Sequence, residues 1–216
     1  MRVFALESDS EPEIAPDEWA FTQHWPDLVD LSLCICSEPA RGTLPLLSHV
    51  HSDAQLTRLS LTHACDLRAV PGKRAEVVAT AQALARHTRL AALYLSWCSV
   101  DVVAAKVLAR RAFTALRQLS ALSLQHDHVD DGAAGVIARC VCRAPLARLV
   151  MSSSTPNDKL TARGVGKVLA QLGGGAVPFH MTIGSAWFEA HRGARRRLQA
   201  AAPANVFLDF GRFIDE

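Results

Sequence analysis

"LAALYLSWCSVD", residues 90–101, contains three leucines that are spaced three and then two residues apart. An amphipathic helix would place its apolar residues at i, i+3, i+4 and i+7, and a half-buried strand would alternate them. The same Leu-x-x-Leu-x-Leu spacing recurs in "LVDLSL" (28–33), "LTRLSL" (56–61), "LSALSL" (119–124) and, with Met in the last place, "LARLVM" (146–151). A spacing that recurs along the chain indicates a structural repeat.

The repeat has a nearly constant period. Its middle leucines are residues 31, 59, 93, 122 and 149, so the steps are 28, 34, 29 and 27 residues. Continuing at this step predicts two degenerate units, "AVPFHM" (176–181) and "NVFLDF" (205–210). The one long step contains "RAVPGKRAE" (68–76), whose Pro-Gly pair is a turn signal. We therefore expect a surplus loop in that unit.

The second half of each unit predicts a helix. In "LTARGVGKVLAQL" (160–172), Gly164 lies four residues after Leu160, and Val168, Leu169 and Leu172 follow at helical spacing. "VDVVAAKVLA" (100–109) repeats this order, and "VDDGAAGVIA" (129–138) repeats it one residue short. Over residues 25–210 the chain thus resembles the leucine-rich repeat family, and within it the ribonuclease-inhibitor-like subclass, whose units are about 28–29 residues long.

The resemblance implies an α/β fold, a leucine-rich-repeat solenoid or horseshoe with parallel strands on the concave face and helices on the convex face. We expect an acidic N-terminal tail and cap (1–24) and one leucine-rich-repeat domain (25–216) of about six to seven repeats, the last two degenerate. Since such a solenoid exposes its core at both ends, aromatic and apolar residues should close it. The candidates are Trp19, Phe21 and Trp25 at the first end and Phe213 and Ile214 at the other.

The cysteines are expected to be structural. The resemblance implies that the residue three places after the last leucine of a unit is Asn or Cys, which faces inward and satisfies backbone groups of the turns. Cys36 and Cys98 occupy this place. In the absence of a secretory signal, all six cysteines are interpreted as reduced thiols. No spacing places a histidine or a helix N-terminus beside a cysteine, so no nucleophile is expected.

Two motifs suggest chemistry but have a structural interpretation. "HDHVDD" (126–131) combines histidines and aspartates, yet Asp130 and Asp131 are placed to begin a helix, where carboxylates suit the helix dipole. The glycines of "LGGGAV" (172–177) follow a helix and lack the Lys-Ser/Thr of a phosphate-binding loop. We expect no catalytic, cofactor-binding or metal-ligating residue, and no cofactor. The chain is therefore predicted not to be an enzyme.

Candidate binding residues flank the core leucines, because side chains alternate along a strand. Trp97, just after the strand of the third unit, is expected to be partly exposed. Together with tyrosine and arginine it forms a plausible binding centre, since these residue types dominate the energetics of interfaces. The candidate partner-binding residues are Asp30, Arg58, Ser60, His63, Tyr94, Trp97, Gln125, His126 and Arg148.

A cluster of arginines near the C-terminus is a second candidate surface. In "HRGARRRLQA" (191–200), Arg192, Arg195 and Arg196 share one helix face. With Arg197 they could contact an acidic partner or RNA phosphates. The alternative is an ordinary solvated helix face.

Composition limits the classes of function. The chain has 216 residues, 50% of them hydrophobic, a net charge of +2 and no apolar run long enough to span a membrane. Its acidic N-terminus lacks a secretory signal, which predicts an intracellular chain in the cytoplasm, including cytoskeletal or ciliary assemblies, with mitochondrial import left open. We predict a non-catalytic protein–protein interaction or scaffold module, a structural subunit of a larger assembly. The alternatives are a subunit of a ribonucleoprotein such as an organellar ribosome and a GTPase regulator of the leucine-rich-repeat type.

Overall fold

The structure is a computed structural model of the chain. It describes residues 2–8, 28–35, 55–62, 67, 74–125, 129–142, 145–152, 159–173, 178–184, 187 and 191–210. For residues 2–8, Ile35, Ser152 and Arg192 it describes the backbone alone.

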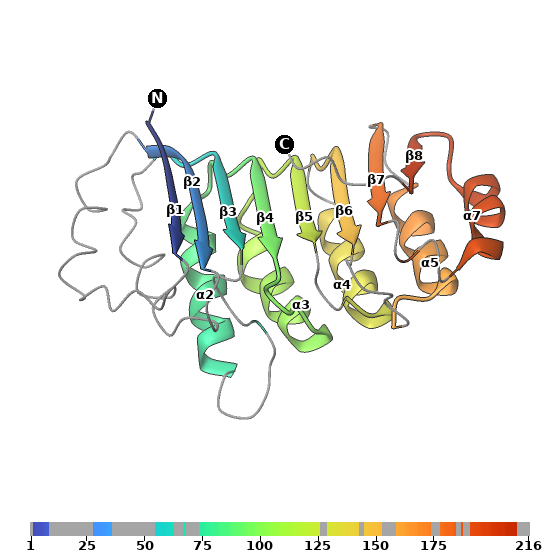
Figure 1. The fold of residues 1–216 in the computed structure, drawn as a ribbon, viewed down its shortest axis with the longest axis horizontal. Coiled ribbons are helices and arrows are strands. Elements are labelled where there is room, and N and C mark those ends of the chain that lie inside the picture. The colour runs from blue at the N-terminus through green and yellow to red at the C-terminus, as the bar shows by residue number, and fades with distance from the viewer. Residues whose placement is uncertain are drawn as a thin grey trace.

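Eight strands form one open, all-parallel sheet, in which the spatial order of the strands is their order in the chain (Figure 1). Within the described residues, β1 and β8 are the two edges of this sheet. The strands are β1 (Arg2–Ser8), β2 (Leu28–Ile35), β3 (Arg58–Thr62), β4 (Ala92–Ser96), β5 (Ala121–Gln125), β6 (Arg148–Ser152), β7 (Phe179–Ile183) and β8 (Val206–Asp209).

Helices connect the strands and lie along one side of the sheet. Figure 1 shows α2 to α5 following one another in the order of the strands, with α7 at the end near β8. The helices are α2 (Arg74–Arg86), α3 (Val102–Leu108), which continues into a π-helical turn, η2 (Ala109–Phe113), then α4 (Asp131–Val141), α5 (Ala162–Leu172), the 3₁₀ turn η3 (Arg192–Ala194) and α7 (Arg195–Ala201). The result is an α/β fold with a parallel sheet. Among the described residues, no helix is both long enough and apolar enough to cross a membrane.

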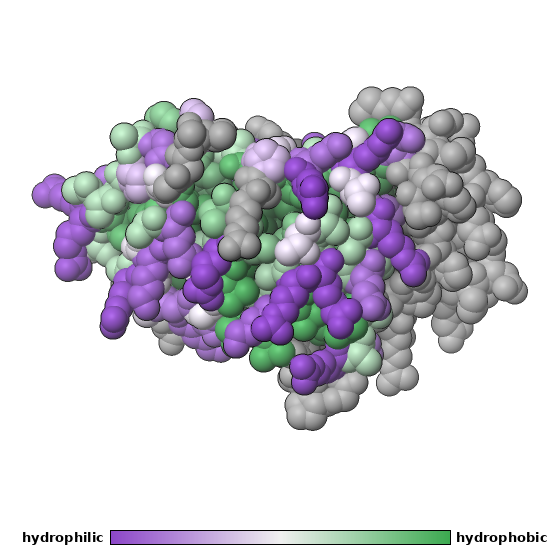
Figure 2. All heavy atoms as spheres, turned by 180° about the vertical axis from the view of Figure 1, so that it is seen from behind, coloured by the Kyte–Doolittle hydropathy of each residue, from purple (hydrophilic) through white to green (hydrophobic). Residues whose placement is uncertain are grey.

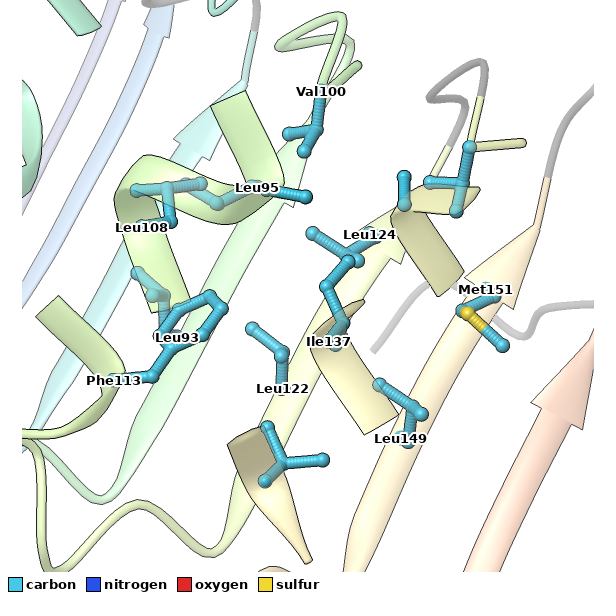
Figure 3. Close-up of a cluster of buried hydrophobic side chains, with 14 of the residues drawn as sticks. Leu93, Leu95, Val100, Leu108, Phe113, Leu122, Leu124, Ile137, Leu149 and Met151 are labelled. Atoms are coloured by element: carbon cyan, nitrogen blue, oxygen red, sulfur yellow. The ribbon is translucent and has the colours of Figure 1, made fainter. Parts of the chain in front are cut away.

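The predicted leucine repeat forms the core. The middle leucines of the units are exact register partners from strand to strand, as in Leu93↔Leu122↔Leu149, and so are the last ones, as in Leu95↔Leu124. All of these leucine side chains are at most 2% exposed. Figure 3 shows them directed toward apolar residues of the helices, such as Ile137 of α4 and Phe113 of η2. The two degenerate units also form strands, β7 and β8, and Leu208 has the predicted middle place in β8. In β7 the residue that pairs with Leu149 is Met181 and not Phe179, the fourth residue of "AVPFHM", so this unit lies two residues later than the period predicts.

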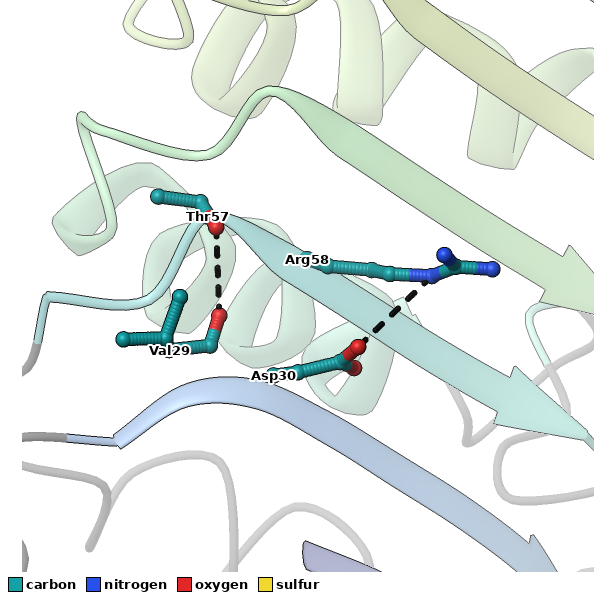
Figure 4. A network of polar contacts seen from close by, with 4 residues as sticks. All are labelled: Val29, Asp30, Thr57 and Arg58. Atoms are coloured by element: carbon teal, nitrogen blue, oxygen red, sulfur yellow. Dashed lines mark hydrogen bonds and ion pairs between the residues drawn. The ribbon is translucent and has the colours of Figure 1, made fainter. Parts of the chain in front are cut away.

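The three-residue step before each strand has a structural cause in a ladder of backbone hydrogen bonds. At the residue preceding the strand, the amide of Thr57 donates to the carbonyl of Val29, and the amide of Ala91 donates to the carbonyl of Thr57, both at 2.8 Å. The same bond recurs from Ser120 to Ala91. Where the residue has a hydroxyl, it adds a second bond, as Thr57 Oγ1 does to Val29 at 3.3 Å (Figure 4). Each unit is thus tied to its neighbour before its strand begins.

The helices begin at side-chain caps placed by the repeat. Asp101, Asp130 and Thr161 precede α3, α4 and α5, and each accepts a hydrogen bond from the backbone amide three residues on. Such a cap satisfies one of the amide groups that the first turn of a helix leaves without a partner. The structural interpretation of Asp130 and Asp131 is therefore confirmed. Asp131 also accepts hydrogen bonds from the amide and the hydroxyl of Thr161, at 2.6 and 2.7 Å.

Part of the predicted N-terminal tail belongs to the sheet, which is a correction to the expectation for residues 1–24. Arg2–Ser8 forms β1, which pairs in parallel with β2. Its sequence "RVFALES" does not have the leucine spacing of the other units. An edge strand needs a partner on one side only, so this segment can extend the sheet without the full repeat pattern. The predicted lid residues Trp19, Phe21 and Trp25 lie outside the described residues.

An aromatic cluster lies at the opposite end of the sheet. Trp187 is 1% exposed, donates its indole N–H to the carbonyl of Leu160, and stacks on His191 with 4.4 Å between the ring centroids. The ring of Phe210 also stacks with Trp187, with 6.2 Å between the ring centroids. The guanidinium of Arg195 lies over the Phe210 ring, 5.7 Å from its centroid. Phe213 and Ile214, the predicted closing residues, lie outside the described part of the chain.

His87, at the end of α2, is a buried histidine without a partner for its ring. It is 2% exposed, and neither ring nitrogen has a hydrogen bond. Burial, aided by the neighbouring positive charge of Arg86, lowers the pKa of His87 below its usual value. Burial therefore favours the neutral form of this imidazole in the folded protein.

We expect His87 to lower the free energy of unfolding at acidic pH. Because its pKa is lower in the folded than in the unfolded state, the unfolded state binds more protons below pH about 6.5, and the free energy of unfolding falls as the pH drops. His87→Leu should be less sensitive between pH 7.5 and pH 5.5, as urea titrations at both values would measure. Thr80→Ser, at a buried position of the same helix, is the control and should leave the pH dependence as in the wild type. Equal pH dependence in wild type and His87→Leu would contradict the prediction.

Candidate interaction surface

The side chains that alternate with the core leucines form the outer sheet face, the face opposite the helices. Strand register places them in three rows across the sheet. The first row is Asp30, Arg58, Ala92, Ala121, Arg148 and His180; the second is Ser32, Ser60, Tyr94, Ser123, Val150 and Thr182; the third is Cys34, Thr62, Ser96 and Gln125.

Three of the predicted binding residues contact one another across neighbouring strands. Arg58 Nε lies 3.9 Å from a carboxylate oxygen of Asp30, and the Arg58 guanidinium lies 4.9 Å from the centre of the Tyr94 ring. Figure 4 shows the side chains of Asp30 and Arg58 extending toward each other from β2 and β3. Because Arg58 is half exposed, the ion pair itself adds little stability. The contact with Asp30 instead orients Arg58, whose guanidinium lies over the Tyr94 ring.

Trp97 directly follows β4, the strand of Tyr94, and has an unusual backbone conformation. Its φ is +58°, and Ser99 has a φ of +55°. Both values lie in the left-handed region, which residues other than glycine rarely adopt. The indole is 40% exposed, which confirms the expected partial exposure. Cys98, between Trp97 and Ser99, is buried, and its thiol lies within hydrogen-bond distance of the carbonyls of Leu61 and Ser96, both at 3.5 Å. The interpretation of Cys98 as a structural residue of the turn is therefore supported.

The unusual φ of Trp97 predicts a reversed order of two substitutions. Trp97→Gly should be about 1 kcal/mol more stable than Trp97→Ala, because only alanine has a Cβ that the left-handed conformation strains. At Gln82, an exposed position within α2, the order should be the usual one, with Gln82→Gly less stable by about 1 kcal/mol. Chemical denaturation of the four variants measures both differences. Trp97→Gly being the less stable of its pair would contradict the strained conformation.

The remaining predicted residues are only partly placed. Ser60 and Gln125 are half-buried on the outer face, and Arg148 is exposed in the first row. His63 and His126, predicted at the end of the strands, lie outside the described residues. The surface therefore brings Asp30, Arg58 and Tyr94 into contact and places Ser60, Gln125 and Arg148 on the same face.

The outer face also has features that the strand pattern alone does not reveal. Ser123 and Val150 are only 2% and 3% exposed, although they lie on the face opposite the helices. Ser123 Oγ has no hydrogen-bond partner. Phe207 of β8, beside His180, is 63% exposed. Alternation places these residues on the outer face, but their exposure depends on which side chains surround them.

The arginine cluster lies on α7 and is solvent-exposed. Arg195, Arg196 and Arg197 are all exposed, and the Arg195 guanidinium is the one over Phe210. The side chain of Arg192 lies outside the description. Figure 2, which views the molecule from behind, shows purple hydrophilic side chains projecting among the green apolar ones.

Within the described residues, the cysteines that suggest chemistry donate hydrogen bonds to backbone carbonyls. Groups of three or more His, Cys, Asp or Glu that could hold a metal ion do not occur there. Cys140 lies within α4 and donates to the carbonyl of Ala109, and Cys142 ends that helix and donates to the carbonyl of Arg139. The thiols of Cys34, Cys98, Cys140 and Cys142 are all free of disulfides.

Comparison with known proteins gives a likeness of fold only. No family model matches the chain, and no curated protein matches its sequence. Among solved structures, one described as leiomodin-1 actin-binding site 2 is similar, with a TM-score of 0.51 and 14% sequence identity. The match covers 76% of this chain and 90% of that one. At this identity the likeness extends to the α/β arrangement and not to a shared activity.

Proposed function

We propose that this protein is a non-catalytic protein-interaction module, a leucine-rich-repeat solenoid of the ribonuclease-inhibitor-like subclass that serves as a subunit of a larger assembly. The observation that carries the proposal is the contact of Asp30, Arg58 and Tyr94 across β2, β3 and β4, with the partly exposed Trp97 directly after β4. The leucine rows in register, the ladder before each strand and the repeated helix caps support the solenoid.

The geometry suits binding for two physical reasons. The sheet backbone is held by the buried leucine rows, so side chains on the outer face are presented with little loss of freedom on binding. Trp97 is kept in a costly backbone conformation with its indole partly in solvent, and strain of this kind gathers at functional positions. Aromatic and arginine side chains supply most of the binding energy at protein interfaces. The similar leiomodin structure is described as an actin-binding site, which is consistent with a protein as the partner class.

Site-specific photo-cross-linking combined with affinity purification tests the proposal. A photoactivatable amino acid at Ser60, on the outer face, should cross-link the partner in extracts, whereas one at Lys106, exposed on α3, should not. Tyr94→Ala combined with Trp97→Ala should lower capture at least about tenfold, as expected when two central aromatic residues are removed. Val103→Ala, which truncates an exposed apolar side chain on α3, is the matched control and should capture as the wild type does. A partner that cross-links from Lys106 alone, or that ignores both aromatic substitutions, would contradict the proposal.

The RNA and GTPase alternatives stay predictions. Three successive exposed arginines on α7 favour contact with phosphates, and such contact weakens steeply with salt. Within the described residues, no feature specifically indicates regulation of a GTPase. In the proposed assembly, α7 would contact either an acidic protein surface or RNA.

A further inference from the structure

Two arginines on the outer face are separated by small side chains. In the first row, strand register aligns Arg58, Ala92, Ala121 and Arg148 on four successive strands, β3 to β6. We call these four residues the Arg58–Arg148 strip. Neighbouring strands are about 4.8 Å apart, so the backbones of the two arginines lie about 14 Å apart. Ala92 and Ala121 lie between them and have short side chains, so they project less from the sheet than the two exposed arginines do.

The charge on this part of the face has one sign. Over β3 to β6, the outer rows contain Arg58 and Arg148 and no acidic residue. The nearest carboxylate in these rows is Asp30 of β2, which partly compensates Arg58 at 3.9 Å. Within the described part of the chain, no ion pair compensates the positive charge of Arg148. The strip is therefore complementary to negative charge.

A buried hydroxyl without a partner lies beside the strip. Ser123 follows Ala121 by two residues on the same face of β5, is 2% exposed, and makes no hydrogen bond. Because the Ser123 hydroxyl is only 2% exposed, a segment that binds over the alanines does not reach it.

We propose that the Arg58–Arg148 strip binds an acidic segment of the partner protein, extended across the strands. This inference rests on the proposed function and specifies the chemistry of its partner. An extended chain advances about 3.4 Å per residue, so carboxylates at i and i+4 span the distance between the arginine backbones. Each arginine pairs with one carboxylate through charge-assisted hydrogen bonds, and small residues of the segment pass over Ala92 and Ala121.

Synthetic peptides test the spacing directly. A fluorescein-labelled peptide with the core Glu-Ser-Thr-Ser-Glu should bind the full chain, and its affinity should fall with added salt. The glutamine version, Gln-Ser-Thr-Ser-Gln, should bind at least about fivefold more weakly, and so should a peptide whose two glutamates are adjacent. Fluorescence anisotropy measures all three affinities.

Protein variants locate the binding. Arg58→Gln and Arg148→Gln should each weaken the Glu-Ser-Thr-Ser-Glu peptide about fivefold, whereas Arg139→Gln and Arg163→Gln, at exposed positions on α4 and α5, should bind it as the wild type does. Circular dichroism confirms that each variant folds. Equal binding by all four variants, no binding by the wild type at millimolar peptide, or tighter binding of a single-stranded RNA oligomer that depends on Arg58 and Arg148 would overturn the inference.

The two proposals fail in distinguishable ways. If the partner captured through Ser60 depends on Tyr94 and Trp97 but not on Arg58 or Arg148, the acidic segment is wrong and the interaction module stands. If the partner cross-links from Lys106 alone, the module is wrong as well, whatever the peptides do.

Discussion

Gly164→Ala is expected to destabilise the protein by about 2–4 kcal/mol. A Cβ at Gly164 would lie 1.9 Å from Asp131 Oδ1 and 2.3 Å from its Cγ, so the carboxylate must move. Moving it breaks two hydrogen bonds from Thr161 and loosens the cap of α5, because the Thr161 hydroxyl that bonds Asp131 also accepts from the Gly164 amide. Hydrogen bonds to a charged group contribute about 1.5–3 kcal/mol and a cap about 1 kcal/mol.

A glycine two residues away is the matched control for this prediction. At Gly166, on the same helix, a Cβ would meet only Leu198 at the ordinary contact distance of 3.9 Å. Gly166→Ala should therefore stabilise the protein by about 0.5–1 kcal/mol, as expected for alanine within a helix. Urea denaturation measures both free energies of unfolding. Like effects at the two glycines would show that the Asp131 contact does not restrict Gly164.

A double-mutant cycle isolates the contact. Asp131→Ala removes both the clash and the hydrogen bonds, so Gly164→Ala should cost much less in that background than in the wild type. Additive effects of the two substitutions would mean that Gly164 is required for another reason.

Leu122→Ala is expected to cost about 3 kcal/mol, within the range of about 2–5 kcal/mol for large-to-small changes in a core. Leu122 is the middle leucine of β5, is 1% exposed, and lies in register between Leu93 of β4 and Leu149 of β6 (Figure 3). Removing it leaves a cavity bounded on both sides by other units, which limits how far the surroundings can collapse. Since a domain of this kind is stable by about 5–15 kcal/mol, the loss should shift the urea midpoint strongly.

The corresponding leucine of the last strand is the control. Leu208 has the same place in β8 as Leu122 has in β5, but it is only partly buried and has a neighbouring described unit on one side, at Met181. Leu208→Ala should therefore cost about half as much or less. A cost for Leu122→Ala no larger than that for Leu208→Ala would refute the view that the central units depend on neighbours on both sides.

Much of the fold could be predicted because one local pattern recurs. The five leucine stretches predicted β2 to β6, and their period predicted β8 in register at Leu208 and β7 with its register two residues early, at Phe179 in place of Met181. Side chains at fixed spacing in successive units meet in register, so the sequence of a repeat contains most of the information about its own neighbours. The caps at Asp130 and Thr161 were predictable from the same order of residues.

The misses come from contacts that the repeat does not encode. β1 has no leucine pattern, because its single partner, β2, supplies the pairing. Trp187 lies outside the repeated positions, and its burial follows from the end of the sheet, where Phe210 and His191 meet it. Of the candidate site, alternation identified the face and the residue types, while the contact of Arg58 with both Asp30 and Tyr94 depends on three adjacent strands.

The sequence by itself determined the period, the parallel α/β order and the direction of the core leucines, since these follow from local spacing repeated at a nearly constant step. Only the tertiary structure decided which side chains on the outer face are available. Trp97 is turned into a left-handed conformation because its amide is bonded to Gln125 of the next strand while Cys98 is held in the interior, and Ser123 loses its solvent without gaining a partner. Exposure and strain arise from neighbours distant in the chain, and no spacing within one unit specifies them.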